Sequence, residues 1–481
     1  MKYIIVGAGP AGLSLAYILS KHNYEIVLIE KDIKLGGSWN SDWIEGKYFS
    51  ENSPRVLFYS GYTQKLLNDI GINNKDLGNI YGNSGFEEKL KVFKFFYNYF
   101  SFQDYLIFLI SLIKFNFFVN INKNLQYWLD NSNLTSKAKN AIRIFSITIC
   151  DIPKKTNIND FFSIFKINPF LQLQQFREPN KWHKLIEQKL IQNKVKIYKN
   201  CMVTEIKTDN KNPIGVLYVN LVNNSINEIK GDKIIIAAQS TGLFNILKNS
   251  SEIIKNNWIN YNYIKDWGKN TYYSSFGFQL HFDKIIKFPN EWGWSAKSEW
   301  TIIILPVSNW LKLISKDKNV KTVWSCCIID FNTKSERLNK TVNECTKDEV
   351  IDECLHQLFK LNKNIINPYK ITYSRKLKKI NNKWYSKNTG FTRANKKFLP
   401  IKGKLNNLYT VGSFSNININ SISFFETAVR ASCKYLEMYE KNIIDIHNYK
   451  NKYYYIISIV LISLILLTIY NIYIYISKIN G

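Results

Sequence analysis

Residues 3–30 of this 481-residue chain read YIIVGAGPAGLSLAYILSKHNYEIVLIE, the clearest structural pattern in the sequence. It predicts a buried strand, a tight glycine turn, an amphipathic helix and a second strand that ends in the acid Glu30. Gly7 permits the turn, Gly9 lets the backbone approach a pyrophosphate, and Gly12 lets the helix pack closely on the sheet. The carboxylate of Glu30 would accept hydrogen bonds from ribose hydroxyls. The stretch therefore predicts a Rossmann-like dinucleotide-binding domain.

A second glycine pair, Gly36 and Gly37, follows Glu30 in the run KDIKLGGSWNS. Physically, such a pair brings another stretch of bare backbone to the cofactor. The arrangement resembles the second glycine motif of the flavoprotein superfamily that includes amine oxidases, phytoene desaturases and flavin monooxygenases. Simple NAD dehydrogenases lack this second motif. The resemblance therefore implies that the dinucleotide is FAD.

The C-terminal part of the chain resembles the closing motif of flavin amine oxidases and desaturases. Residues 408–436 read LYTVGSFSNININSISFFETAVRASCKYL, a strand that leads into a helix whose N-terminus would face the flavin ring. Gly412 matches the glycine of that motif, and Glu426 matches the glutamate of its aromatic-x-Glu-x-Ala stretch. Phe424 matches one of the two aromatic rings that flank the substrate in amine oxidases. Ser413 stands where the family usually has an acid that contacts the cofactor.

Three further segments extend this resemblance. NKVKIYKNCMVTEIKT (193–208) is similar to the family's strand that lends backbone groups to the adenine, with Val203 at the matching place. KIIIAAQSTGLFNIL (233–247) is similar to the connection from the cofactor domain to the substrate domain. ENSPRVLFYSGY (51–62) is similar to the stretch in which desaturase-like members place an arginine near the flavin, so Arg55 becomes a candidate for contacting cofactor or substrate.

The predicted fold class is α/β, with a Rossmann-like FAD-binding domain interleaved with a mixed α+β substrate domain and followed by one C-terminal transmembrane helix. The FAD-binding domain comes in three parts, 1–62, 176–250 and 391–445. A helical substrate or cap region occupies 63–175, and the mixed substrate domain occupies 251–390.

The C-terminal segment 453–476 reads YYYIISIVLISLILLTIYNIYIYI and contains no charge. At 1.5 Å per residue it is long enough to cross the ~30 Å hydrocarbon layer of a bilayer, and its tyrosines gather near its ends. Lysines 441, 450 and 452 precede the segment, whereas only Lys478 follows it. We therefore expect a single-pass membrane protein with its N-terminal bulk in the cytosol.

A second apolar run, Tyr105 to Val119, lies within the aromatic-rich and predicted helical segment 86–133. It is too short to span a bilayer and is interrupted by Lys114 and Asn116. The run predicts a buried or interfacial helix rather than a second membrane span.

Composition excludes several other classes of protein. The formal net charge is +28, yet the lysines are scattered and no zinc-finger, helix-turn-helix or RNA-binding signature accompanies them, so nucleic acid is not the expected partner. The seven cysteines form no C-x-x-C pair, so neither a disulfide scaffold nor a zinc site is indicated, and no metal is expected. A reducing compartment fits this cysteine usage.

The function that the resemblance implies is removal of a hydride from a C–H bond of an amine or an apolar small molecule to flavin N5. The covalent-flavin turn Ser-Gly-Gly-Cys is absent from the sequence, so FAD is expected to bind noncovalently. Two alternatives stay open. Gly36-Gly37-Ser38-Trp39 resembles the GGxW of NADPH-dependent flavin monooxygenases, although the second GxGxxG of that class is missing. Ser413 and Thr427, which replaces a usual glycine, also allow a non-catalytic membrane-anchored scaffold.

Overall fold

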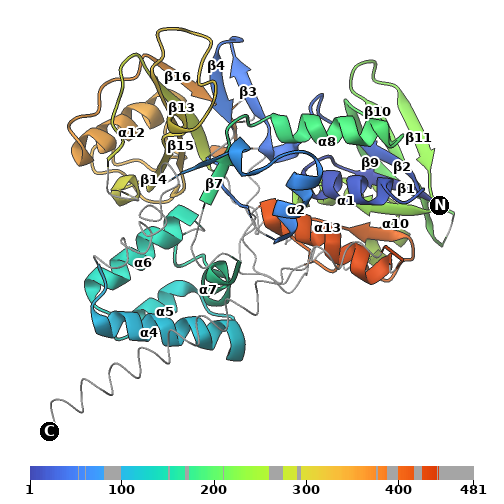
Figure 1. Cartoon of the computed structure of the whole chain (residues 1–481), viewed down its shortest axis with the longest axis horizontal. Helices are drawn as coiled ribbons and strands as arrows, with labels where there is room; N and C mark the ends of the chain where they lie inside the picture. Colours follow the sequence, from blue (N-terminus) through green and yellow to red (C-terminus); the bar gives the residue numbers. More distant parts are fainter. Residues whose placement is uncertain are drawn as a thin grey trace.

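The computed structural model shows a dinucleotide-binding domain, a second domain built on an antiparallel sheet, and a helical region (Figure 1). It describes residues 1–51, 54–59, 61–80, 99–149, 152–167, 173–209, 211–258, 275–289, 294–374, 377–386, 399–415, 425–440 and 442–443. The predicted transmembrane segment 453–476 and Phe424 lie outside these residues. Within them, no helix is both long and apolar enough to span a bilayer.

A five-stranded parallel sheet forms the centre of the dinucleotide-binding domain, with the strand order β19-β12-β1-β2-β8. Its strands come from three distant parts of the chain, as the interleaved organisation predicts. They are β1 (Lys2–Val6), β2 (Glu25–Ile29), β8 (Lys196–Tyr198), β12 (Lys233–Ile236) and β19 (Leu408–Thr410). Strands β1, β2, β8 and β19 lie in segments predicted as strands, and β12 lies in the segment predicted to connect the two domains.

Helices cover one face of this parallel sheet. In β1, Tyr3 and Ile5 point into a core shared with these helices, whereas Ile4 and Val6 point into the core on the opposite face. Burial on both faces explains why the strand reads as a continuous apolar run. The covering helices are α1 (Pro10–Ser20), α2 (Gly61–Asp69), α8 (Lys181–Gln192) and α13 (Phe425–Tyr439). The predicted boundary at 62/63 therefore falls inside α2, whose Leu66 and Leu67 belong to this core.

The opposite face of the parallel sheet packs on a three-stranded antiparallel sheet and two short helices. Val203, Ile206 and Val216 supply the apolar side chains of that sheet to the shared core. Its strands are β9 (Cys201–Thr208), β10 (Pro213–Asn220) and β11 (Ile226–Lys230), and the helices are α9 (Ser240–Asn249) and α10 (Glu252–Trp258).

The second domain is a four-stranded antiparallel sheet, β14-β15-β13-β16, packed on α12 (Lys347–Leu361). Phe278, Trp324 and Ile304 point toward the helix side, while Gln279 and Ser325 alternate with these apolar residues along the strands. The strands are β13 (Phe276–Phe282), β14 (Ile302–Leu305), β15 (Thr322–Ile328) and β16 (Lys370–Tyr373), with a hairpin of β17 (Leu377–Ile380) and β18 (Lys383–Ser386) beside them.

Two small sheets join the domains. They contain β3 (Ser41–Ile44), β4 (Tyr48–Glu51), β5 (Leu57–Phe58), β6 (Leu77–Asn79) and β7 (Leu173–Phe176). Short 3-10 helices lie at η1 (Gly37–Trp39), η2 (Asn74–Asp76), η4 (Trp294–Lys297) and η5 (Val307–Asn309).

The helical region lies below the antiparallel domain in Figure 1 and has its own aromatic core. Phe162 contributes to it by stacking on Phe115 and by meeting Trp128 edge to face. The elements are α4 (Phe102–Ile113), the π-helix η3 (Lys114–Phe118), α5 (Leu125–Asn131), α6 (Ser136–Ile149) and α7 (Ile158–Ile167). Within the described part of segment 86–133, which was predicted to be helical, residues 102–118 and 125–131 are helical.

Candidate dinucleotide-binding site

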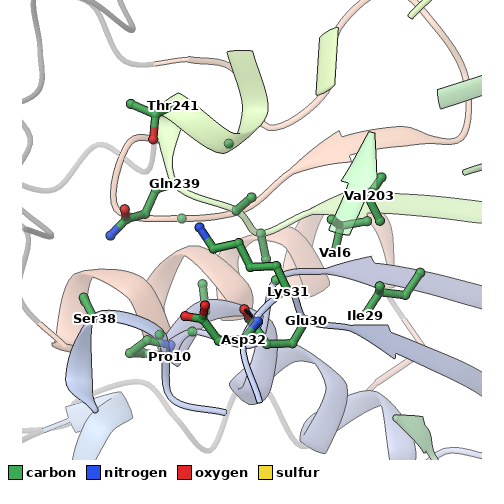
Figure 2. Close-up of a pocket in the computed structure, with 18 of the residues that line it drawn as sticks. Val6, Pro10, Ile29, Glu30, Lys31, Asp32, Ser38, Val203, Gln239 and Thr241 are labelled. Carbon is green, nitrogen blue, oxygen red and sulfur yellow. Dashed lines mark hydrogen bonds between the residues drawn. The ribbon is translucent and has the colours of Figure 1, made fainter. Parts of the chain in front are cut away.

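A cavity of about 250 Å³ opens at the carboxyl ends of the parallel strands. This edge is where open α/β sheets bind ligands. Its wall is assembled from segments that are far apart in sequence but adjacent in the fold (Figure 2). Seven of the predicted cofactor-binding residues line it, namely Gly7, Gly9, Glu30, Gly37, Val203, Gly412 and Ser413.

The glycine turn after β1 has the geometry that a bound pyrophosphate requires. Gly7 has φ +101°, a left-handed conformation that favours glycine, and its N–H donates to the carbonyl of Ile29 at 2.8 Å. A Cβ at Gly12 would lie 1.9 Å from the carbonyl oxygen of Gly7, so Gly12 lets the helix approach the turn. At Gly9, by contrast, a Cβ would meet no atom within 4 Å. The open side of Gly9 is therefore available to a ligand.

Helix α1 begins at this turn without a side-chain cap. Gly9 is the N-cap residue, and Pro10 occupies the first helical position. Both residues line the cavity, so the positive end of the helix dipole faces it. A helix N-terminus with this exposure attracts an anionic group such as a pyrophosphate.

Glu30 lies at the end of β2 and is held by backbone donors. Its two carboxylate oxygens accept hydrogen bonds from the N–H of Ala8 at 2.7 Å and from the N–H of Asp32 at 3.0 Å. Burial raises the pKa of the Glu30 carboxyl, although these two hydrogen bonds act in the opposite direction. Since each carboxylate oxygen has a further acceptor site, Glu30 can still accept hydrogen bonds from ribose hydroxyls in the cavity.

The second glycine pair folds over the first turn. Gly36 and Gly37 have φ +107° and +56°, and the N–H of Gly36 donates to the carbonyl of Ala8 at 2.8 Å. A Cβ at Gly37 would lie 2.9 Å from the Cα of Gly9. Only Gly37 of the pair lines the cavity, and Gly36 instead ties the loop to the turn. The pair thus brings a second length of bare backbone to the same space.

Three segments from later in the chain contribute to the wall. Val203 and Cys201, both in β9, line the cavity, and burial raises the pKa of the Cys201 thiol. Gly412 and Ser413 enter it directly after β19, as the closing-motif resemblance predicts. Ala428 lines it from the first turns of α13. The beginning of that helix therefore faces the cavity.

Glu426 lies outside the cavity wall and instead joins α13 to α2. One carboxylate oxygen accepts a hydrogen bond from the N–H of Thr63 at 2.8 Å, and the other pairs with Arg430 at 2.5 Å. Arg430 also lies over the ring of Tyr62. The hydrogen bond from Thr63 ties α13 to α2, and the pair of Glu426 with Arg430, which lies within α13, balances the buried charge of Glu426. A direct contact of Glu426 with a cofactor stays a prediction.

Arg55 also lies outside the wall, in a buried polar cluster between β4 and the antiparallel sheet. Burial raises the pKa of Glu51 to about 7, although a hydrogen bond from Ser325 and the positive charge of Arg55 act in the opposite direction. Glu51 also accepts a hydrogen bond from the side chain of Gln175 at 3.1 Å. The role of Arg55 as a contact of cofactor or substrate stays a prediction.

Several polar residues of the wall were not singled out from the sequence. They are Lys31, Asp32, Gln239, Thr241 and Asn245. Figure 2 shows Lys31 reaching from the end of β2 toward Gln239, which follows β12. The positions of Lys31, Asp32 and Gln239 in the sequence could have identified them, because residues that follow parallel strands lie at the ligand-binding edge of the sheet.

The fold and this cavity define the chain as a dinucleotide-binding α/β protein. Residues 5–70 match the model of the NAD(P)-binding Rossmann-like domain family. This match includes both glycine motifs and Glu30. No curated protein matches the sequence.

Solved structures share the fold over nearly the whole chain. An oxidoreductase from Methanosarcina mazei is 13% identical with a TM-score of 0.62, covering 91% of this chain and 100% of its own. Cyclohexylamine oxidase from Brevibacterium oxydans is 12% identical with a TM-score of 0.59, covering 92% and 99%. A putrescine oxidase bound to putrescine is 12% identical with a TM-score of 0.58, covering 93% and 99%. The chain therefore has the fold of the amine oxidase-like flavoproteins, which confirms the predicted resemblance at the level of fold.

Proposed function

We propose that this chain is an FAD-dependent oxidoreductase of the amine oxidase type, which takes a hydride from a C–H bond of an amine or apolar small molecule. The observation that carries the proposal is the single cavity in which the Gly7–Gly12 turn, Glu30, Gly37, Val203 and Gly412 meet. The amine oxidases among the similar structures support the same class of chemistry.

The residues of the cavity fit the parts of FAD. The open face of Gly9 and the N-terminus of α1 suit the pyrophosphate, and Glu30 suits the adenosine ribose. Val203, on the edge of β9, suits the adenine. Gly412, Ser413 and the beginning of α13 suit the flavin half of the molecule. NAD has no flavin, so a simple NAD-binding site would not need Gly412, Ser413 and the beginning of α13.

FAD, when bound, supplies a hydride acceptor at flavin N5, and the protein supplies orientation and electrostatics. Ser413 replaces the usual acid with a hydroxyl, which can donate or accept one hydrogen bond at the ribityl and phosphate region. Ala428, in the first turns of α13, lines the cavity together with Gly412 and Ser413, so this helix adjoins the space that we assign to the flavin. The hydrogen bond from the N–H of Thr63 to Glu426 ties that helix to α2.

The membrane location rests on the sequence alone. The uncharged segment 453–476 and the excess of lysines before it support a single C-terminal span with the catalytic bulk in the cytosol. We include this arrangement in the proposal because an anchored enzyme of this class would meet apolar substrates at the bilayer.

The first experiment is the visible absorption spectrum of the full-length protein, purified in detergent, before and after acid precipitation. Yellow flavin bands that leave with the supernatant would support noncovalent FAD. Bands that stay with the pellet would contradict noncovalent binding. A colourless protein that also fails to take up added FAD would overturn the oxidoreductase proposal and favour the scaffold alternative. Bleaching by primary amines under anaerobic conditions would then test the substrate class.

A further inference from the structure

The helix α4 and the following π-helix η3 carry apolar side chains on their outer face. Phe102 is 60% exposed, Ile110 63%, Phe117 56% and Phe118 78%. Such exposed side chains are ordinary when they are scattered singly over a surface, but these four lie within 17 consecutive residues.

The inner face of the same helices is fully engaged in the core of the helical region. Phe115 stacks on Phe162 at 5.2 Å between ring centroids, and Phe108 packs on the same ring at 5.5 Å. Asp104 is completely buried and accepts hydrogen bonds from Ser101 and Thr135. The helices therefore already bury their inner side in this core, and the apolar outer side is not needed for it.

The positions of these residues follow the helical period. Phe102, Leu106, Ile110, Ile113 and Phe117 recur at intervals of three or four, which places them on one side of the helix. A surface helix of a soluble domain normally carries polar residues on this side. Figure 1 shows α4 along the outer edge of the helical region, away from both sheets.

The charges around this face suit anionic lipid headgroups. Between residues 101 and 123, all of which the structure describes, Asp104 is the only acid and it is buried, whereas Lys114 and Lys123 are exposed. Lysines beside an apolar stripe are the pattern of helices that lie in the plane of a membrane interface, and each contributes attraction to an anionic leaflet. A helix of 12 residues is too short to span the bilayer.

We propose that the outer face of α4 and η3 lies in the interface of a lipid bilayer, with the apolar stripe below the headgroups and Lys114 and Lys123 among the phosphates. This contact places the helical region, and with it one side of the protein, against the lipid. It is separate from the proposed C-terminal span and from FAD binding, since it depends on neither.

The test uses the full-length chain bound to vesicles of phosphatidylcholine and phosphatidylserine. Single surface cysteines replace Ile110 and Phe117 and carry an environment-sensitive fluorophore. Ile285, 82% exposed, and Val222, 75% exposed, receive the same label as matched controls on the other two parts of the fold. The unsubstituted chain gives the background, because each cysteine in the described part of the chain is buried.

We expect blue-shifted emission at 110 and 117, and loss of that emission when the vesicles contain doxyl-labelled lipid, with neither effect at 222 and 285. A chain that floats with the vesicles while its labels at 110 and 117 remain unquenched would overturn the interface and leave only the C-terminal span. A chain that does not float would overturn both. Blue-shifted labels in the absence of vesicles, unaffected by doxyl lipid, would also overturn the interface and indicate that a second copy covers α4.

Discussion

Replacement of Gly9 with alanine should separate cofactor binding from folding. A Cβ at this position meets no protein atom within 4 Å, and the backbone has φ −76° and ψ −177°, which alanine adopts readily. Alanine is a poorer N-cap residue than glycine, so the expected loss of stability is only about 0.5 kcal/mol. The new methyl group would, however, stand in the cavity where a pyrophosphate must approach the backbone.

The expected effect on binding follows from the contact that the methyl group would block. A hydrogen bond to a charged group contributes about 1.5–3 kcal/mol. Its loss would weaken FAD binding roughly 10- to 150-fold. The assay is titration of the flavin-free protein with FAD, followed by flavin fluorescence, alongside urea unfolding of the same sample.

Gly12→Ala provides the contrast. Its Cβ would lie 1.9 Å from the carbonyl oxygen of Gly7, which is backbone and cannot move aside, so this variant should fail to fold. Equal FAD affinity in Gly9→Ala and the unsubstituted protein would refute the assignment of the turn to the pyrophosphate. A stable, flavin-binding Gly12→Ala would refute the close packing of helix and turn.

Three further substitutions test the surroundings of the site. Glu30→Ala removes the acceptor for two backbone N–H groups and should lower the free energy of unfolding by about 1–3 kcal/mol. The same substitution should lower FAD affinity. Unchanged affinity would argue against a contact between Glu30 and the ribose. Because burial raises the pKa of Glu51 to about 7, protonation favours the folded state, so the free energy of unfolding should fall by about 3 kcal/mol as the pH rises from about 4.5 through 7. Glu51→Gln should lack this decline in urea unfolding measured across that range, and a parallel decline would contradict the raised pKa. Glu426→Gln leaves the charge of Arg430 buried without its partner and should cost about 3 kcal/mol in thermal unfolding. Adding Arg430→Met should recover much of that loss, and an additive further loss would contradict the pairing.

The local elements were predictable because their signals are short in range. The apolar runs of the two strands, the glycine turn and the acid at the end of β2 all lie within residues 3–30, and the structure confirms each of them. The closing strand β19 and helix α13 were likewise predictable from their own patterns. Resemblance added Val203 and Gly412, which the structure places in the same cavity as Gly9.

Contacts between distant segments were less predictable. Glu426 was expected at the cofactor, yet its described contacts are with Thr63 and Arg430. Nothing in the local sequence indicates that partner, since Thr63 lies 363 positions away. Phe424 and the predicted span 453–476 lie outside the described residues, so they stay predictions.

Residues 3–30 alone specify the dinucleotide-binding class, because the backbone conformation at Gly7 and the close packing at Gly12 are requirements that only glycine meets. By contrast, contacts between distant segments select the polar side chains that share the cavity and the face of α4 that remains outside the core. Periodicity shows that a helix has sides, but α4 carries apolar residues on more than one side, so its sequence does not show which side is buried. The buried side follows from the packing of Phe108 and Phe115 against Phe162, a residue of α7 that lies far along the chain.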